Sequence, residues 1–198
     1  MNPPVLVYHK VEAGFELGVN VVSPATFRRQ MEWLAHAGFA AVTLRDALAA
    51  GNSAGANARR VVLTFDDGYT GIALHVAPVL RALGFRATIF VPSAFVGARS
   101  DWDTALLGRR YRHLDRTALR DLAADGFEIG SHSATHRDLR RLDDAELLAE
   151  TAGSRQTLAD ITGHDVVTYC YPFGRSDARV RAAVARAGFI AACGGGAP

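Results

Sequence analysis

The sequence predicts an α/β protein in which a mostly parallel sheet is wrapped by helices. Short apolar segments alternate with longer amphipathic segments along the 198 residues. The stretch 61–65 (VVLTF) is apolar without alternation, which is typical of a strand buried on both faces. Gly-Phe follows four helical segments, as expected where a helix ends and a buried strand begins. These dipeptides stand at 38–39, 84–85, 126–127 and 188–189.

Strands and helices are expected to alternate from one end of the chain to the other. Strands are expected at 5–8 (buried), 40–43, 61–65, 87–91, 127–130, 166–171 and 189–192. Helices are expected at 24–37, 44–50, 72–83, 116–125, 143–162 and 177–187, with a surface loop at 51–58 that is rich in Gly, Asn, Ser and Ala. The first helix has the clearest start, because Ser23 is a good N-cap residue and Pro24 suits the first helical position.

Composition limits the class of protein. Hydrophobic residues make up 49% and charged residues 21% of the chain, which excludes disordered, collagen-like and coiled-coil classes. The length predicts one domain over residues 1–198. With 22 basic and 20 acidic residues, the net charge is only +2, which is too small to indicate a nucleic-acid binder.

No apolar run is long enough to span a bilayer and no secretory signal is visible, so we expect a cytoplasmic protein. Cys170 and Cys193 are expected to be reduced, partly buried thiols.

Polar side chains that can bind a metal follow two of the predicted strands. Such folds bind ligands at the carboxyl ends of their strands. Asp66 and Asp67 follow the strand at 61–65, and His132 and His136 follow the strand at 127–130. Two histidines four residues apart can face one ion, with a carboxylate from a neighbouring strand end as third ligand. Each pattern alone is more often a turn or a solvated pair, but their joint occurrence at strand ends favours a metal centre.

Two motifs at these positions resemble a known family. TFDDG at 64–68 and HSATH at 132–136 are similar to the first two signature motifs of the polysaccharide deacetylases, the NodB-homology family of carbohydrate esterases. The likeness extends upstream to LVYH at 6–9 and downstream to YPFG at 171–174. It implies a distorted, incomplete (β/α) barrel that forms a single catalytic domain. It also implies a metal-dependent hydrolase that removes acetyl groups from the N-acetylated sugars of a poly- or oligosaccharide.

The resemblance also implies roles for single residues. Asp66 would be the catalytic base. Asp67, His132 and His136 would bind a divalent metal ion, with zinc favoured and cobalt or nickel as alternatives. The backbone N–H of Phe173 would help to bind the oxyanion. Ser133 and Thr135 would steady the turn between the two histidines.

The sequence departs from the family pattern at two places. Many relatives have an arginine that pairs with the base, and here Cys170 stands near that place. Arg175 is either its substitute or a solvated loop charge. The family also supplies a late histidine as general acid, but none follows His164. Either the C-terminus is truncated, another residue protonates the leaving group, or activity is weak. His9 is the best substitute, with a structural plug or a substrate contact as the alternative roles.

The remaining candidates are weaker. Trp102, with Asp101 and Asp103, is expected in a loop on the same face, where it either stacks on a sugar ring or packs the loop against the barrel. The other histidines, which receive no function, are His36, His75, His113 and His164.

Besides N-deacetylation, two functions remain open. One is an O-acetyl esterase or small-amide amidohydrolase on the same fold. The other is a catalytically impaired metal- or glycan-binding module, against which the retained Asp66 argues. The glycan, the metal and the oligomeric state do not follow from the sequence.

Overall fold

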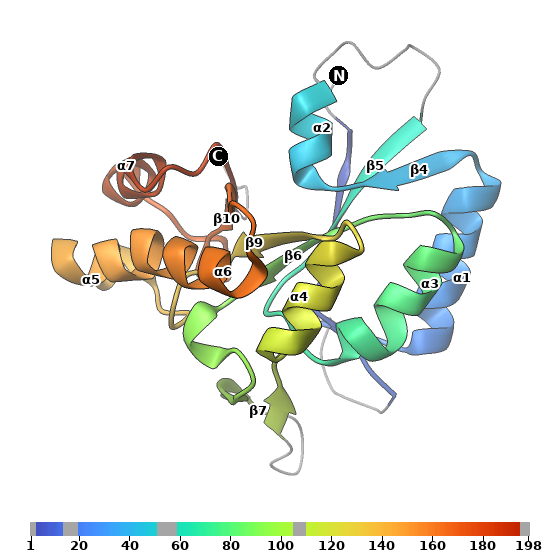
Figure 1. Cartoon of the computed structure of the whole chain (residues 1–198), viewed down its shortest axis with the longest axis horizontal. Helices are drawn as coiled ribbons and strands as arrows, with labels where there is room; N and C mark the ends of the chain where they lie inside the picture. Colours follow the sequence, from blue (N-terminus) through green and yellow to red (C-terminus); the bar gives the residue numbers. More distant parts are fainter. Residues whose placement is uncertain (1–2, 14–19, 51–58, 105–109, 195–198) are drawn as a thin grey trace.

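The computed structural model describes residues 3–13, 20–50, 59–104 and 110–194, and its centre is one curled, parallel sheet (Figure 1). Every strand pair in this sheet is parallel. The strands follow the order β1 (Val5–Tyr8), β5 (Arg59–Phe65), β6 (Thr88–Val91), β9 (Glu128–Ser131), β10 (Thr168–Cys170) and β11 (Ala191–Cys193), and β4 (Phe39–Val42) also pairs with β5. The sheet therefore forms the expected incomplete barrel, with β1 and β11 at the two ends of the order.

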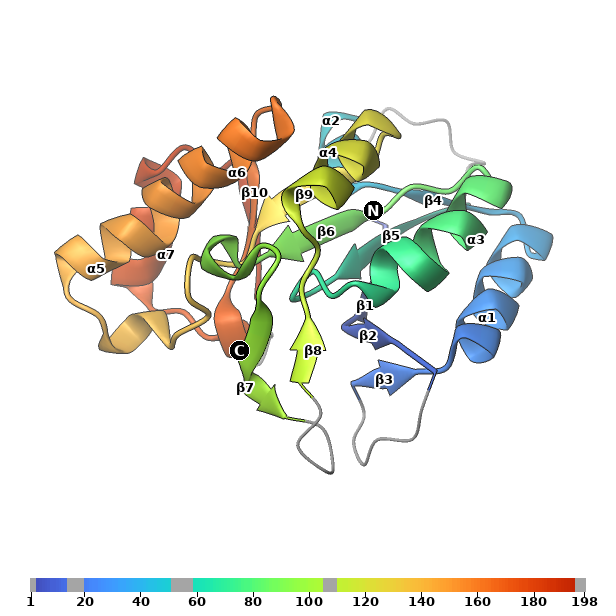
Figure 2. The same ribbon diagram turned by 60° about the horizontal axis from the view of Figure 1, so that its bottom comes forward.

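Helices cover the outer side of the sheet (Figures 1 and 2). They are α1 (Pro24–His36), α2 (Leu44–Ala50), α3 (Ala77–Ala82), α4 (Arg116–Ala124), α5 (Asp144–Leu148), α6 (Ser154–Thr162) and α7 (Ala178–Arg186). The helix expected at 143–162 is present, but its middle turn is a π-helical segment, Ala149–Gly153, which joins α5 to α6. A second π-helical segment, Ile72–Val76, leads into α3.

Local sequence signals account for the ends of these elements. Ser23 caps α1 as expected, because its side-chain oxygen accepts a hydrogen bond from the backbone N–H of Thr26 at 3.1 Å. All four glycines of the Gly-Phe pairs have positive φ, between 67° and 91°. Phe85, Phe127 and Phe189 then enter the core, whereas Phe39 is only half-buried.

The structure differs from the sequence prediction at the edges of the sheet. The strand expected to be buried at residues 5–8 is exposed, because β1 ends the strand order and lacks a neighbour on one side. Two small sheets were not expected: β2 (Lys10–Val11) with β3 (Val21–Val22), and β7 (Arg99–Thr104) with β8 (Arg110–Arg112). Trp102 thus lies on a strand and not in a loop. The expected loop at 51–58 lies outside the described residues.

Both small sheets lie at the same end of the main sheet (Figure 2). They are joined by an ion pair, in which Nζ of the buried Lys10 lies 2.8 Å from Oδ2 of Asp103. The hydroxyl of Tyr69 donates a hydrogen bond to the same oxygen at 2.8 Å. This contact places β7 beside the carboxyl end of β5.

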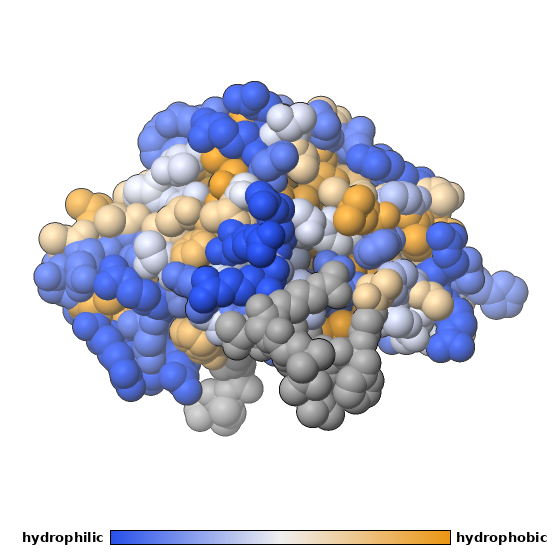
Figure 3. Space-filling view, turned by 90° about the horizontal axis from the view of Figure 1, so that it is seen from below, coloured by the Kyte–Doolittle hydropathy of each residue, from blue (hydrophilic) through white to orange (hydrophobic). Residues whose placement is uncertain are grey.

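Seen from below, the surface has a band of hydrophilic residues across its middle, with apolar residues in separate patches on either side (Figure 3).

Among the described residues, no helix combines the length and the apolar character that a membrane span requires.

Candidate metal centre

The three predicted metal ligands, Asp67, His132 and His136, meet at the carboxyl edge of the sheet. Because β5 and β9 are parallel and both pair with β6, Asp67 and His132 leave the sheet at the same end. His132 stays in the strand ladder, since its backbone N–H donates to the carbonyl of Val91 at 3.0 Å. The turn after His132 brings His136 back to Asp67.

The ligand atoms of Asp67, His132 and His136 converge. Oδ1 of Asp67 lies 3.7 Å from Nε2 of His132 and 3.4 Å from Nε2 of His136. All three residues are buried, and their donor atoms lie within 4.8 Å of one another. Oδ1 of Asp67 has no hydrogen-bond partner among the described residues. A buried carboxylate oxygen that faces two imidazole nitrogens fits a divalent cation.

The hydrogen bond of His132 orients it for metal binding. Its Nδ1 lies 2.8 Å from the carbonyl oxygen of Cys170, which can only accept, so Nδ1 carries the proton. Nε2 is therefore left with its lone pair directed toward Asp67. Burial lowers the pKa of His132, and it also lowers the pKa of His136 to about 3, helped by the nearby histidines. Both rings are therefore neutral at physiological pH, as metal binding requires.

Burial also acts on the two aspartates. It raises the pKa of Asp67 to about 6, with His132 opposing the shift and Asp66 adding to it. Burial raises the pKa of Asp66 as well, while the charge of His9 and the thiol of Cys170 partly offset the effect. A carboxylate with a raised pKa is a better proton acceptor, which suits Asp66 to general-base work.

The site is built from strained backbone. Asp67, Ser133, His136 and Phe173 are the non-glycine residues with positive φ in the described part of the chain, at 67°, 65°, 57° and 58°. All four belong to the motifs that the sequence singled out. Strain of this kind costs about 1–3 kcal/mol per residue and tends to gather at functional sites. Among the described residues, this strain is confined to the motifs at this edge of the sheet, which supports its choice as the candidate site.

The predicted site residues line one open pocket of about 580 Å³. Its walls contain every predicted catalytic and metal-binding residue: His9, Asp66, Asp67, His132, His136 and Phe173. Nε2 of His9 lies 3.9 Å from Oδ2 of Asp66. A pocket of this size suits a small organic ligand or one or two sugar rings of a larger one.

A thiol lies beside the carboxylate of Asp66, at the place where many relatives have an arginine. Sγ of Cys170 lies 3.6 Å from Oδ2 of Asp66, so a thiol occupies the place beside the carboxylate. Arg175 lies instead 3.4 Å from Oδ2 of Asp138 and is half-exposed. It therefore does not pair with Asp66. Cys170 and the nearby Cys193 are free thiols, as expected.

Sequence reasoning missed one residue of the site. His113 was assigned no function, yet it is buried and its Nδ1 donates to the backbone carbonyl of Asp67 at 2.6 Å. It supports the backbone that carries the aspartate. Because the two residues lie 46 positions apart and follow different elements, no spacing in the sequence could have revealed the contact.

Comparisons with known proteins place the chain in a family. A family model described as "Polysaccharide deacetylase" matches residues 53–192. The Bacillus subtilis protein YxkH is 27% identical over 187 residues, which cover 94% of this chain and 62% of YxkH. A chitin deacetylase from Pestalotiopsis is 31% identical over 110 residues, covering 56% of this chain and 32% of that protein.

A solved structure extends the comparison to the whole fold. The crystal structure of a polysaccharide deacetylase from Bacillus cereus matches with a TM-score of 0.79 and 27% identity. The match covers 98% of this chain and 58% of that one. The chain thus spans about three fifths of the length of YxkH and of the Bacillus cereus protein.

Proposed function

Since the chain belongs to the polysaccharide deacetylase family, we propose that it is a metal-dependent hydrolase that removes acetyl groups from N-acetylated sugars of a poly- or oligosaccharide. The observation that carries the proposal is the convergence of Asp67, His132 and His136 beside a second buried carboxylate, Asp66. A site for binding alone needs the first three residues but not the fourth.

Asp67, His132 and His136 would hold the metal ion through one carboxylate oxygen and two imidazole nitrogens. This donor set suits zinc, and cobalt or nickel would also be accepted. When bound, such an ion supplies Lewis-acid activation of water and of the acetyl carbonyl. With three protein ligands, such an ion would keep open positions for water and substrate.

Asp66 would act as the base. It lies next to Asp67 in the chain and lines the same pocket, so it can accept the proton that the attacking water loses. The oxygen of that water forms a new bond to the acetyl carbon. The thiol of Cys170 would help to orient the Asp66 carboxylate through its contact to Oδ2.

Phe173 and His9 would complete the reaction. The backbone N–H of Phe173 would donate to the oxyanion of the tetrahedral species. When the C–N bond breaks, the amine leaves with a proton, and His9 would deliver it. The products are acetate and a free amino sugar.

A second function has one observation in its favour. No arginine or lysine side chain of the described residues pairs with Asp66, because Cys170 occupies that place and Arg175 pairs with Asp138. Weakened base chemistry would leave a metal- or glycan-binding module. An O-acetyl esterase or a small-amide amidohydrolase would use the same residues and differ only in the leaving group.

Acetate release from N-acetylated oligosaccharides tests the proposal. We expect release by the zinc-loaded wild type, none after chelation and recovery on zinc addition. Asp66→Asn is expected to keep the ion and lose activity by roughly 10²–10⁴-fold. Release that is insensitive to the chelator would rule out the metal mechanism. A tightly held ion without release from any acetylated sugar would favour the binding module.

A further inference from the structure

We propose that Glu150 is a positioning residue of the metal centre, which holds the turn between His132 and His136 in its ligand-binding conformation. The proposal rests on the proposed function, because it assigns Glu150 a role toward the same ligands. Glu150 falls within the helix expected at 143–162, and no motif in the sequence assigns it a role. Its contacts distinguish it from an ordinary helical glutamate.

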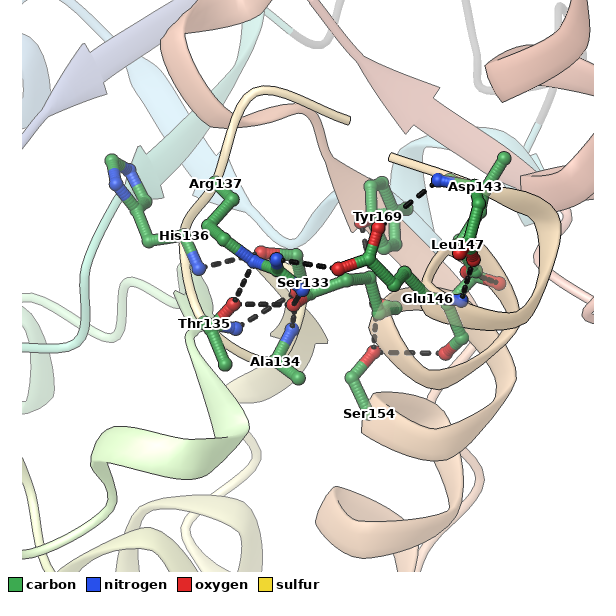
Figure 4. A network of polar contacts seen from close by, with 12 residues as sticks. Ser133, Ala134, Thr135, His136, Arg137, Asp143, Glu146, Leu147, Ser154 and Tyr169 are labelled. Carbon is green, nitrogen blue, oxygen red and sulfur yellow. Dashed lines mark hydrogen bonds and ion pairs between the residues drawn. The ribbon is translucent and has the colours of Figure 1, made fainter. Parts of the chain in front are cut away.

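The carboxylate of Glu150 is an acceptor for the whole turn. Its Oε2 accepts hydrogen bonds from the backbone N–H groups of Ala134 and Thr135, both at 2.8 Å. Its Oε1 accepts from the hydroxyl of Thr135 and lies 3.4 Å from Nη2 of Arg137. Figure 4 shows how Ala134, Thr135 and Arg137 face this network. Glu150 is 2% exposed, so its carboxylate is largely shielded from water and its hydrogen bonds are correspondingly stronger.

The turn needs such support because its backbone is unfavourable. Ser133 and His136 both have positive φ, which non-glycine residues rarely adopt. Within the turn, the hydroxyl oxygen of Ser133 accepts the backbone N–H of His136 at 3.0 Å. That bond joins the two ends of the turn, and Glu150 binds the two amides between them. Charged acceptors make the stronger hydrogen bonds to backbone N–H groups.

Glu150 is itself held firmly against the sheet. It lies in the π-helical segment Ala149–Gly153, a kind of irregularity often found at functional sites. Its backbone carbonyl accepts from the hydroxyls of Ser154 at 2.9 Å and Tyr169 at 3.4 Å. The Oγ atoms of Ser154 and Ser131 lie 2.7 Å apart, which ties the helix to the end of β9. His132 is the next residue after Ser131.

Glu150 therefore acts on the ligands through the turn and not by contact with an imidazole ring. Glu146, one helical turn earlier, provides a matched comparison. It also pairs with Arg137, at 2.9 Å, but its side chain is 41% exposed and makes none of the contacts to Ala134 and Thr135. Neutralising Glu146 removes a carboxylate charge from the same helix and keeps the acceptor of the Ala134 and Thr135 amides in place.

The test uses three variants: Glu150→Ala, Glu150→Gln and Glu146→Gln. The measurements are amide hydrogen exchange of Ala134 and Thr135 in the metal-free protein, the Zn²⁺ dissociation constant by chelator competition, and kcat and KM for acetate release. We expect Glu150→Ala to speed exchange of the two amides and to weaken Zn²⁺ binding by about 10–100-fold. Its kcat should fall while its KM stays near that of the wild type.

The conservative variant should rescue part of the effect. The amide oxygen of Glu150→Gln can still accept both N–H groups, so its exchange rates and Zn²⁺ affinity should lie between those of the wild type and Glu150→Ala. Glu146→Gln should match the wild type in all three measurements.

A folded Glu150→Ala protein with wild-type amide exchange and Zn²⁺ affinity would overturn the proposal. If that variant does not fold, Glu150→Gln decides, and unchanged exchange and affinity in it would have the same meaning. If the wild type binds Zn²⁺ but releases no acetate, the proposed function fails while exchange and affinity still test Glu150. If the wild type binds no Zn²⁺, the exchange comparison alone decides whether Glu150 holds the turn.

Discussion

The indole of Trp102 lies flat against the imidazole of His136, with ring centroids 4.4 Å apart and planes at 11°. Phe95 meets the same indole edge-on, with centroids 4.6 Å apart. One face of Trp102 is therefore occupied by a predicted metal ligand, so a sugar ring cannot stack there. This favours the second of the two roles considered for Trp102, in which it packs against the barrel.

This stacking makes Trp102 a fluorescence probe for the metal site. The chain has two tryptophans, and Trp33 is 64% exposed on α1. In a Trp33→Phe variant, Co²⁺ bound by His136 should quench the fluorescence of Trp102, and a chelator should restore it. A Trp102→Phe variant, which keeps Trp33, should show little change. Stoichiometric Co²⁺ binding without quenching would place the ion elsewhere.

The affinity for a metal ion should fall at low pH, because the carboxyl of Asp67 takes up a proton there. Burial raises the pKa of Asp67 to about 6, so below that pH the ion must displace a proton from this carboxyl. The pKa of His136 is lowered to about 3, so its ring stays neutral and does not compete. We expect the Zn²⁺ association constant to be level above pH 7 and to fall about tenfold per pH unit below about 6. Competition titrations over this range measure the slope, and a slope of two or three protons per ion would contradict the assignment.

His9 is expected to matter for the leaving group. If its ring protonates the departing amine, His9→Ala should lower kcat on an N-acetylated sugar by roughly 10²-fold or more. An activated aryl acetate needs no such proton, so its hydrolysis should fall much less in the same variant. Zn²⁺ affinity should not change, because His9 is not a ligand. Unchanged turnover on the sugar would remove His9 from the mechanism.

A side chain at Gly130 should destabilise the fold. A Cβ there would lie 2.6 Å from ring atoms of Phe90 and 2.8 Å from Oγ1 of Thr168, within the tightly packed centre of the sheet. Overpacking of this kind costs about 1–3 kcal/mol, so Gly130→Ala should lower the free energy of unfolding by that amount. Gly153→Ala is the control, since the nearest atom to its Cβ would be 4.0 Å away. Denaturant unfolding of both variants compares them, and equal stability would show that the sheet can relax around Gly130.

Much of the fold could be predicted from local patterns. Four helices begin with a side chain that accepts a backbone N–H of the first turn, so their starts can be predicted from the sequence. These N-cap residues are Ser23, Asp115, Asp143 and Asp177. The small sheets were missed because their pairing is decided by tertiary contacts. Strand β7 is held by the ion pair between Lys10 and Asp103, two residues far apart in the sequence.

The candidate chemical groups could be chosen from the sequence, because a carboxylate pair and a histidine pair that each follow a strand of a parallel sheet are expected at the same edge. The contacts that hold these side chains in place appear only in the folded chain. Three contacts of this kind join segments that folding brings together. His113 binds the carbonyl of Asp67, and Trp102 stacks on His136. The backbone amides of Ala134 and Thr135 donate to Glu150. The chemical type of a residue is local, whereas the support that fixes its orientation comes from neighbours that the linear chain does not specify.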